Sequence, residues 1–263
     1  MTPSFLRACA LLLAVAAGTA SAQEFSVLVS PPRFEDRAQP GTTWRQVLEI
    51  TNVSASAARL SMRTADWLLL PDGSVDFENA LQPSSCRPWV GIEAGEVRIE
   101  AGAKRRYRFE VAVPADAPTG ECRFALMLEG DPQAAATSPV PVSGRIGVIV
   151  YLAVGDAAPK LEVVEGEVVE VEGRPVPALR IRNAGNAHGR LEGLVDGVDA
   201  DGRRYAFAPN GLPILPGETR SIALVPQGDA PDAPAPVLAW PVRVQGRLET
   251  ATGPIAIEAA FAR

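Results

Sequence analysis

The sequence predicts an all-β chain built as two sandwiches in series, and three observations carry this prediction. Short apolar runs with alternating polar residues recur along the chain, separated by turn-forming pairs such as Asp72-Gly73 and Asn210-Gly211. After residue 22 no segment has a persuasive helical period. The 263 residues include 24 prolines and 23 glycines, which punctuate apolar runs and form no low-complexity block. This length and punctuation fit two domains of ordinary size.

The first 22 residues are expected to form a secretory signal peptide. They contain one Arg, an apolar run from Ala8 to Ala17, and small residues at Ala20 and Ala22 in an A-x-A cleavage pattern. A buried N-terminal helix is the alternative, and the cleavage pattern argues against it. No later stretch stays apolar over the roughly 20 residues that a membrane-spanning helix needs. We therefore expect an exported chain that does not span a membrane.

Two cysteines, Cys86 and Cys122, remain after the signal peptide. In an oxidising compartment such a pair is most simply a disulfide, which would stabilise the fold by about 2–4 kcal/mol. A metal site is the alternative, but no Cys or His pair has ligand spacing and the chain holds one His. We expect a disulfide, no metal and no cofactor. The formal net charge of −6 argues against nucleic acid and anionic membranes as partners.

The first strand starts at Phe25 and is broken by Pro31-Pro32, which predicts an edge strand with a kink. A second feature, the stretch from Ser138 to Val154, reads as one strand much longer than the usual five or six residues. Its apolar residues share one parity and so one face: Val140, Val142, Ile146, Val148, Val150 and Leu152. Such a strand can serve the core along part of its length and leave a hydrophobic edge over.

Domain boundaries follow from the segment GDAAPK, residues 155–160, which reads as a linker. We expect a signal peptide over 1–22, a first sandwich over 23–155 and a second over 160–263. Signals for catalysis are weak. His188 is expected in a turn, and Asp196, Asp199 and Asp201 are expected in an exposed acidic turn, since the calcium-loop Glu is missing. No nucleotide-binding, serine-hydrolase or zinc-protease motif occurs, so we expect no enzyme and no catalytic residue.

The order of these features resembles the periplasmic pilus chaperones of the PapD-like superfamily. The segment VSPPRFED, with Arg33 near its centre, precedes VLEITNVS; IEAGAKRRYRFEVAVP, another strand, the long strand and a second sandwich follow. The resemblance covers essentially the whole mature chain, in layout more than in signature. It implies two immunoglobulin-like β-sandwich domains in tandem and a periplasmic location. The implied partners are a pilus, fimbrial or surface subunit and an outer-membrane usher that receives it.

In that family the long strand donates alternating hydrophobic side chains to an incomplete subunit, by β-augmentation. The resemblance implies Val140 and Val142 as donors, with Ile146 as a further candidate. The alternative for Val140 and Val142 is that they fill the chain's own core. That core role is the expectation for the second half of the strand: Val148, Val150 and Leu152.

The family also anchors the subunit's C-terminal carboxylate with two basic residues. Arg33 matches the first, and a solvated edge charge is its alternative role. The second, a Lys in the family, falls at Gly147, which departs from the pattern. Arg145 would either substitute for it at a shifted register or stand as an exposed strand charge. The alternative function is a structural or adhesive exported immunoglobulin-like protein without chaperone activity.

Overall fold

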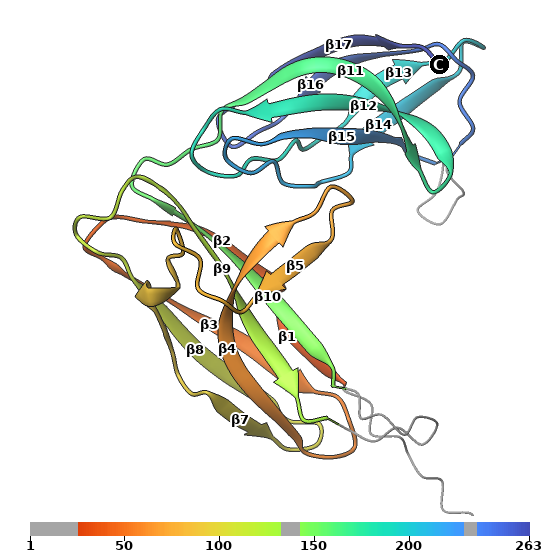
Figure 1. Cartoon of the computed structure of the whole chain (residues 1–263). Coiled ribbons are helices and arrows are strands. Elements are labelled where there is room, and N and C mark those ends of the chain that lie inside the picture. Colours follow the sequence, from red (N-terminus) through yellow and green to blue (C-terminus); the bar gives the residue numbers. More distant parts are fainter. Residues whose placement is uncertain (1–25, 133–142, 229–235) are drawn as a thin grey trace, which may run out of the picture.

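A computed structural model describes residues 26–132, 143–228 and 236–263, and it confirms the predicted all-β fold class (Figure 1). Strands β1 to β10 build one sandwich, and strands β11 to β17 form a second sandwich-like body beside it. In these ranges the helical content is one 3-10 turn, η1 (Arg87–Trp89), and nothing there is a helix long and apolar enough to cross a membrane. The signal peptide prediction lies outside the described residues.

The first sandwich has two sheets. One sheet holds, in spatial order, β1 (Val27–Ser30), β3 (Thr43–Asn52), β8 (Lys104–Ala112) and β6 (Val90–Ile92). The other holds β2 (Arg33–Ala38), β10 (Arg145–Val154), β9 (Gly120–Gly130), β4 (Ala58–Leu69) and β5 (Val75–Glu78), with β7 (Glu96–Ile99) also paired to β4. Alternate residues of both sheets point inward, and their core includes a run of edge-to-face aromatic rings: Phe34, Trp44, Phe109 and Phe124.

The Pro31-Pro32 break moves the chain from one sheet to the other. Before it, β1 pairs antiparallel with β3; after it, β2 pairs parallel with β10. Proline has no N–H to donate to a ladder, so the chain leaves the first sheet at this point. The predicted kinked edge strand is confirmed.

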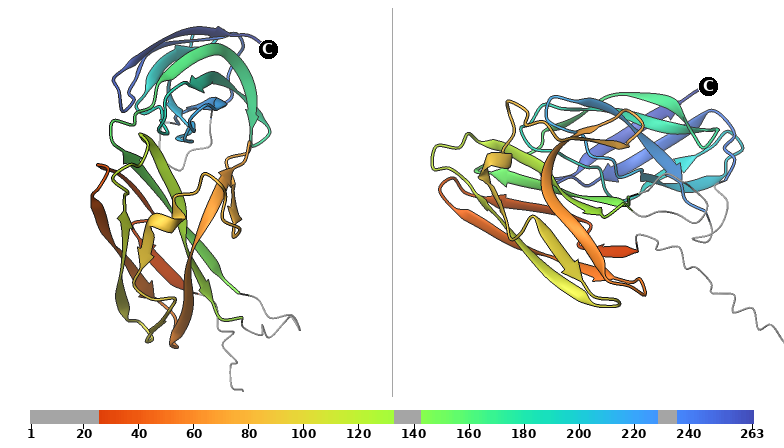
Figure 2. Two further views of the ribbon diagram at one scale, coloured as in Figure 1. Left: turned by 60° about the vertical axis from the view of Figure 1, so that its left-hand side comes forward. Right: turned by 60° about the horizontal axis from the view of Figure 1, so that its bottom comes forward.

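The second sandwich is one rolled sheet of seven strands, whose two edge strands approach each other (Figures 1 and 2). In spatial order they are β11 (Leu161–Val171), β12 (Arg174–Asn183), β15 (Thr219–Pro226), β14 (Arg204–Pro209), β13 (Val195–Val198), β16 (Val242–Leu248) and β17 (Ile255–Phe261). Its core is fully enclosed around Phe207, Leu179 and Phe261.

The β4–β5 hairpin rises out of the first sandwich towards the second (Figures 1 and 2). Its turn contains Asp72 and Gly73, as predicted, and Gly73 has the left-handed φ of +85° that glycine tolerates best. The hairpin covers the outer face of the first sandwich's sheet that contains β10. A separate small apolar cluster there includes Trp67, Met127 and Tyr151. The middle of this sheet is therefore buried on both faces.

Candidate functional site

Strand β10 is covered unequally along its length. Residues 149–154 lie between β2 and β9, whereas residues 145–148 pair with β9 alone. In the described parts of the chain no strand pairs with the other side of 145–148. The N–H of Gly130 donates to the carbonyl of Gly144 at 3.0 Å, so by antiparallel alternation the main-chain groups of Arg145 and Gly147 point away from β9. An open edge of this kind can accept another strand.

The predicted long strand is shorter in the structure than in the sequence analysis. It begins at Arg145, and Ser143 precedes it with its hydroxyl donating to the Gly130 carbonyl at 2.5 Å. Val140 and Val142, the two predicted donor residues, lie outside the described residues. Their role stays a prediction.

The inward face of β10 follows the expected division of roles. The second half of the strand is fully buried in the core of the first sandwich, through Val148, Val150 and Leu152. Ile146 is only partly buried, packing against that core from its end. Ile146 thus stands at the point where core packing gives way to the open edge.

The outward face of β10 explains the missing Lys. A Cβ built on Gly147 would lie 2.2 Å from Cζ of Phe77, which comes from the β4–β5 hairpin. A side chain at position 147 would therefore require the Phe77 ring to move. Arg145 is exposed and its guanidinium lies 5.9 Å from the centroid of the Phe77 ring. It lies over the Phe77 ring of the hairpin, and among the described residues it forms no ion pair.

Arg33, the predicted carboxylate anchor, already holds a carboxylate from its own strand. It is the first residue of β2, opposite Ile149, and its Nε lies 2.7 Å from Oε1 of Glu35. The side chain is 54% exposed, so this pair alone contributes little to stability. A partner's carboxylate would have to compete with Glu35 for Arg33.

Glu35 also faces two residues of the second sandwich. Nη2 of Arg190 lies 3.1 Å from Oε1, and Nε2 of His188 lies 3.6 Å from Oε2. The interaction with His188, followed by the charges of Arg190 and Arg33, lowers the pKa of Glu35 to about 2 even though partial burial works in the opposite direction. Glu35 is therefore ionised over the whole ordinary pH range.

His188 is the residue whose importance the sequence analysis missed. It lies in the loop between β12 and β13, as the turn prediction implied, but its ring stacks on Tyr151 of β10 with centroids 3.9 Å apart. Its main-chain N–H donates to Oε2 of Glu121 at 2.9 Å, and its Nδ1 bonds the same oxygen. Glu121 lies 67 residues before His188 and Tyr151 lies 37 residues before it, so no local sequence pattern could have found these contacts.

A second contact joins the two sandwiches at the tip of the hairpin. The buried guanidinium of Arg220, on β15, donates to the carbonyls of Leu70 at 3.0 Å and Pro71 at 3.3 Å. Glu218 pairs with the same guanidinium at 2.5 Å. The hairpin that fills the space over Gly147 is thus held by the second sandwich.

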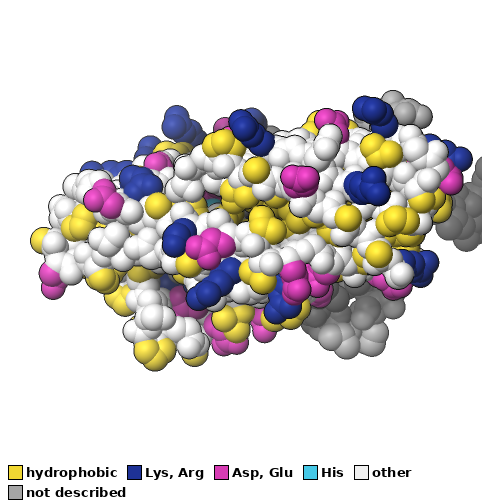
Figure 3. Space-filling view, turned by 90° about the horizontal axis from the view of Figure 1, so that it is seen from above, with side chains coloured by type: hydrophobic (Ala, Val, Ile, Leu, Met, Phe, Trp, Pro, Cys, Tyr) yellow, Lys and Arg dark blue, Asp and Glu magenta, His cyan; other side chains and the backbone are white. Residues whose placement is uncertain are grey.

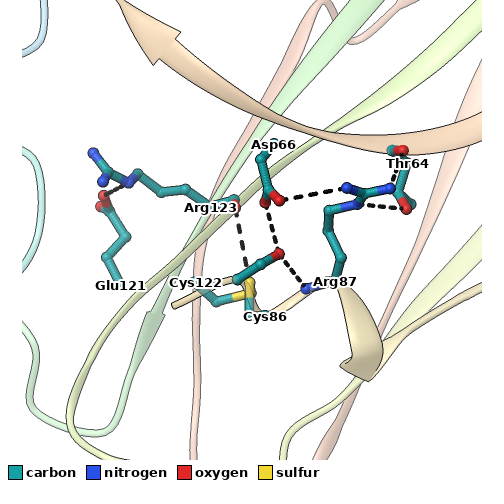
Figure 4. The surroundings of a disulfide bond; sticks show 8 residues. Thr64, Asp66, Cys86, Arg87, Glu121, Cys122 and Arg123 are labelled. Atoms are coloured by element: carbon teal, nitrogen blue, oxygen red, sulfur yellow. Dashed lines mark hydrogen bonds and ion pairs between the residues drawn. A yellow bond between two sulfur atoms is a disulfide. The ribbon is translucent and has the colours of Figure 1, made fainter. Parts of the chain in front are cut away.

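The predicted disulfide between Cys86 and Cys122 is present, with Cα atoms 5.5 Å apart (Figure 4). It ties the loop before η1 to β9, next to Arg87. The Arg87 guanidinium donates to the Thr64 carbonyl at 2.7 Å and lies 3.4 Å from Asp66. Arg87 thereby satisfies part of the β4 edge, and Asp66 is a structural partner of this loop.

Of the three residues of the predicted acidic turn, Asp196 and Asp201 are exposed. The prediction of an exposed acidic turn is wrong for Asp199, which is buried and accepts hydrogen bonds from the main chain of Asp201 and Arg203 and from the Tyr205 hydroxyl. Within the described ranges no three His, Cys, Asp or Glu side chains gather as a metal site. What the site offers chemically is an open strand edge beside a contact between the two sandwiches that already contains ion pairs.

No protein-family model matches the sequence, and no curated protein matches it. Similar solved structures include the YadV chaperone, at 11% identity and a TM-score of 0.47, covering 90% of this chain and 100% of that one. The Class 5 fimbriae chaperone CfaA has 10% identity and a TM-score of 0.49, with 89% and 98% covered. The CsuC-CsuE chaperone–tip adhesion subunit complex of Acinetobacter baumannii has 13% identity and a TM-score of 0.45, with 90% and 98% covered.

The first two are chaperones, CfaA being one of Class 5 fimbriae, and the third is a chaperone in complex with a tip adhesion subunit. At these identities the likeness is one of fold.

Proposed function

We propose that the protein binds an extended segment of an exported partner along the open edge of β10, as a periplasmic chaperone for a pilus, fimbrial or surface subunit. The observation that carries the proposal is the unequal cover of β10, with residues 145–148 paired on one side only. A strand added there would gain main-chain hydrogen bonds from Arg145 and Gly147, and alternate side chains would supply a partner with apolar contacts. The resemblance in layout supports the same mode of binding.

The proposed donor surface consists of Ile146 together with Val140 and Val142 of the preceding segment. Because the donated strand supplies core that the subunit lacks, release needs exchange with another strand and no nucleotide. An outer-membrane usher is the proposed recipient, and the signal peptide over residues 1–22 the proposed route to the periplasm.

A second candidate function is a structural or adhesive exported module. It is favoured because both positions of the expected carboxylate anchor are occupied: Phe77 fills the space over Gly147, and Glu35 pairs with Arg33. A carboxylate-ended partner has no free pair of cations at these positions.

Capture from the periplasm, with mass spectrometry of what is captured, distinguishes the two functions. Arg145→Pro removes an N–H that faces the open side, and Val142→Glu places a charge on the proposed donor face. Val164→Glu is the matched control, because Val164 is an exposed valine on the β11 edge of the second sandwich. We expect a small β-rich subunit with the wild type and the control, and its loss in both test variants.

Arg33→Ala tests the proposed carboxylate anchor separately from the open edge of β10. Loss of the subunit with this variant would assign Arg33 to the binding site, whereas retention would leave it as a partner of Glu35. If the wild type captures no subunit, or all variants capture it equally, the chaperone proposal fails and the structural module takes its place.

A further inference from the structure

The seam between the two sandwiches concentrates the chain's unusual polar chemistry. His188, from the second sandwich, inserts its ring among groups of three strands of the first: Glu121 on β9, Glu35 on β2 and Tyr151 on β10. The side chain of Glu121 is only 2% exposed and that of His188 13%. This is the one histidine in the chain.

Three arginines lie close to the two carboxylates that contact the imidazole. Arg190, on the same loop, pairs with Glu35 and lies over Tyr151 at 5.8 Å from the ring centroid. Arg123 on β9 lies 3.6 Å from the far oxygen of Glu121. Arg33 pairs with Glu35 from outside. The two carboxylates nearest the ring therefore favour a positive imidazole, while its burial opposes one.

Closure of this seam is also opposed by unsatisfied polar atoms. In the described residues, four buried side-chain atoms lack a hydrogen-bond partner, and all belong to this region: Trp67 Nε1, Glu121 Oε1, Arg123 Nη1 and Arg190 Nε. Buried polar atoms without partners cost free energy. These costs are offset by the Arg190–Glu35 ion pair and by the contacts of the imidazole with Glu121 and Glu35, which are stronger when the imidazole is charged.

We propose that this seam is a proton-controlled latch between the sandwiches, closed while His188 is protonated between Glu121 and Glu35 and loosened when that proton is lost. Burial by itself lowers the pKa of His188, but its bonds to Glu121 and Glu35 outweigh burial, and the net shift is upward from 6.5. A group with a raised folded pKa contributes stability that is complete below its ordinary pKa and is lost as pH rises through the folded value. The latch therefore opens on the alkaline side.

The chain offers a direct measurement, because a single histidine gives a single set of imidazole NMR signals in tag-free protein. We expect the titration midpoint of His188 above 6.5 in the full chain, and lower in Glu121→Gln. Glu165→Gln is the matched control, since Glu165 pairs with Arg180 at an exposed site on β11. A midpoint at or below 6.5 in the wild type overturns the proposal, whether or not the variants fold.

Hydrogen exchange tests whether the proton controls the contact. Corrected for intrinsic rates, amide protection of the loop over residues 184–192 should fall as pH rises through the midpoint, about tenfold for each unit by which the pKa is raised. The turn over 199–203, held by Asp199, should keep its protection. In His188→Gln the loop should lose this pH dependence. Unchanged protection of the wild-type loop through the titration would overturn the latch.

Discussion

The two halves of β10 share one strand and one inward face but differ in what lies beside them. Residues 149–154 have a strand on each side, the core below, and Tyr151 under the seam above. Residues 145–148 have β9 on one side and the Phe77 ring above. The comparison teaches that apolar alternation reports burial of a face, whereas the availability of an edge depends on where a neighbouring strand ends.

The largest expected effect is a difference in the free energy of unfolding between variants of the two halves of β10. Leu152→Ala, in the covered half, should lower the free energy of unfolding by about 2–5 kcal/mol, because the residue is fully buried. Ile146→Ala should cost only about 1 kcal/mol, since Ile146 packs at the end of the core. Chemical denaturation of the two variants beside the wild type measures both. Equal losses would show that the open half is packed as firmly as the covered half.

A smaller effect tests what Phe77 does to the open half. Gly147→Lys should destabilise the chain by about 1–3 kcal/mol, because its Cβ would meet the Phe77 ring. In a Phe77→Ala background the same change should cost less, as the ring is gone. Gly95→Lys is the control, since a Cβ at Gly95 meets nothing within 4 Å. Thermal unfolding of the set gives the coupling; the same cost in both backgrounds would contradict the steric explanation.

The smallest expected effect is a loss of stability in acid. It involves the covered half of β10, where Glu35 lies opposite Tyr151. The folded pKa of Glu35 is about 2, below its ordinary 4.5. Its stabilising contribution is therefore present above pH 4.5 and is lost as pH falls towards 2. Melting temperatures between pH 5 and 2 should fall less steeply in Glu35→Gln than in the wild type. Glu165→Gln should follow the wild type, and parallel curves for all three would contradict the role of Glu35.

Local patterns predicted the parts of the fold that local chemistry determines. Pro31-Pro32 breaks the first strand because proline cannot continue a ladder, and Asp72-Gly73 turns the β4–β5 hairpin because glycine accepts a positive φ. Cys86 and Cys122 form the disulfide that was expected from the two thiols left after the predicted signal peptide. Each of these follows from a residue's own properties and a few neighbours.

The packing over Gly147 and the ion pairs between the two sandwiches could not be predicted in this way. Gly147 registers in the sequence only as a departure from a family pattern, and the Phe77 ring that explains it lies 70 residues earlier. The ion pairs of Glu35 with Arg190 and His188 join two sandwiches whose mutual placement no periodicity encodes. Arg33, for which a solvated edge charge was the alternative role, is a partner of Glu35.

The hold of Arg220 on the hairpin has a consequence for how the chain is made. Synthesis completes residues 27–154 long before Arg220 exists, so the nascent first sandwich has neither the guanidinium that binds the carbonyls of Leu70 and Pro71 nor Leu215, which packs on its outer apolar cluster. Until then, the face around Trp67 and Tyr151 is covered by the hairpin alone, and the tip of the hairpin lacks its partner. The last third of the polypeptide thus acts as a built-in cover for the first, and chains truncated after residue 155 should be prone to aggregate.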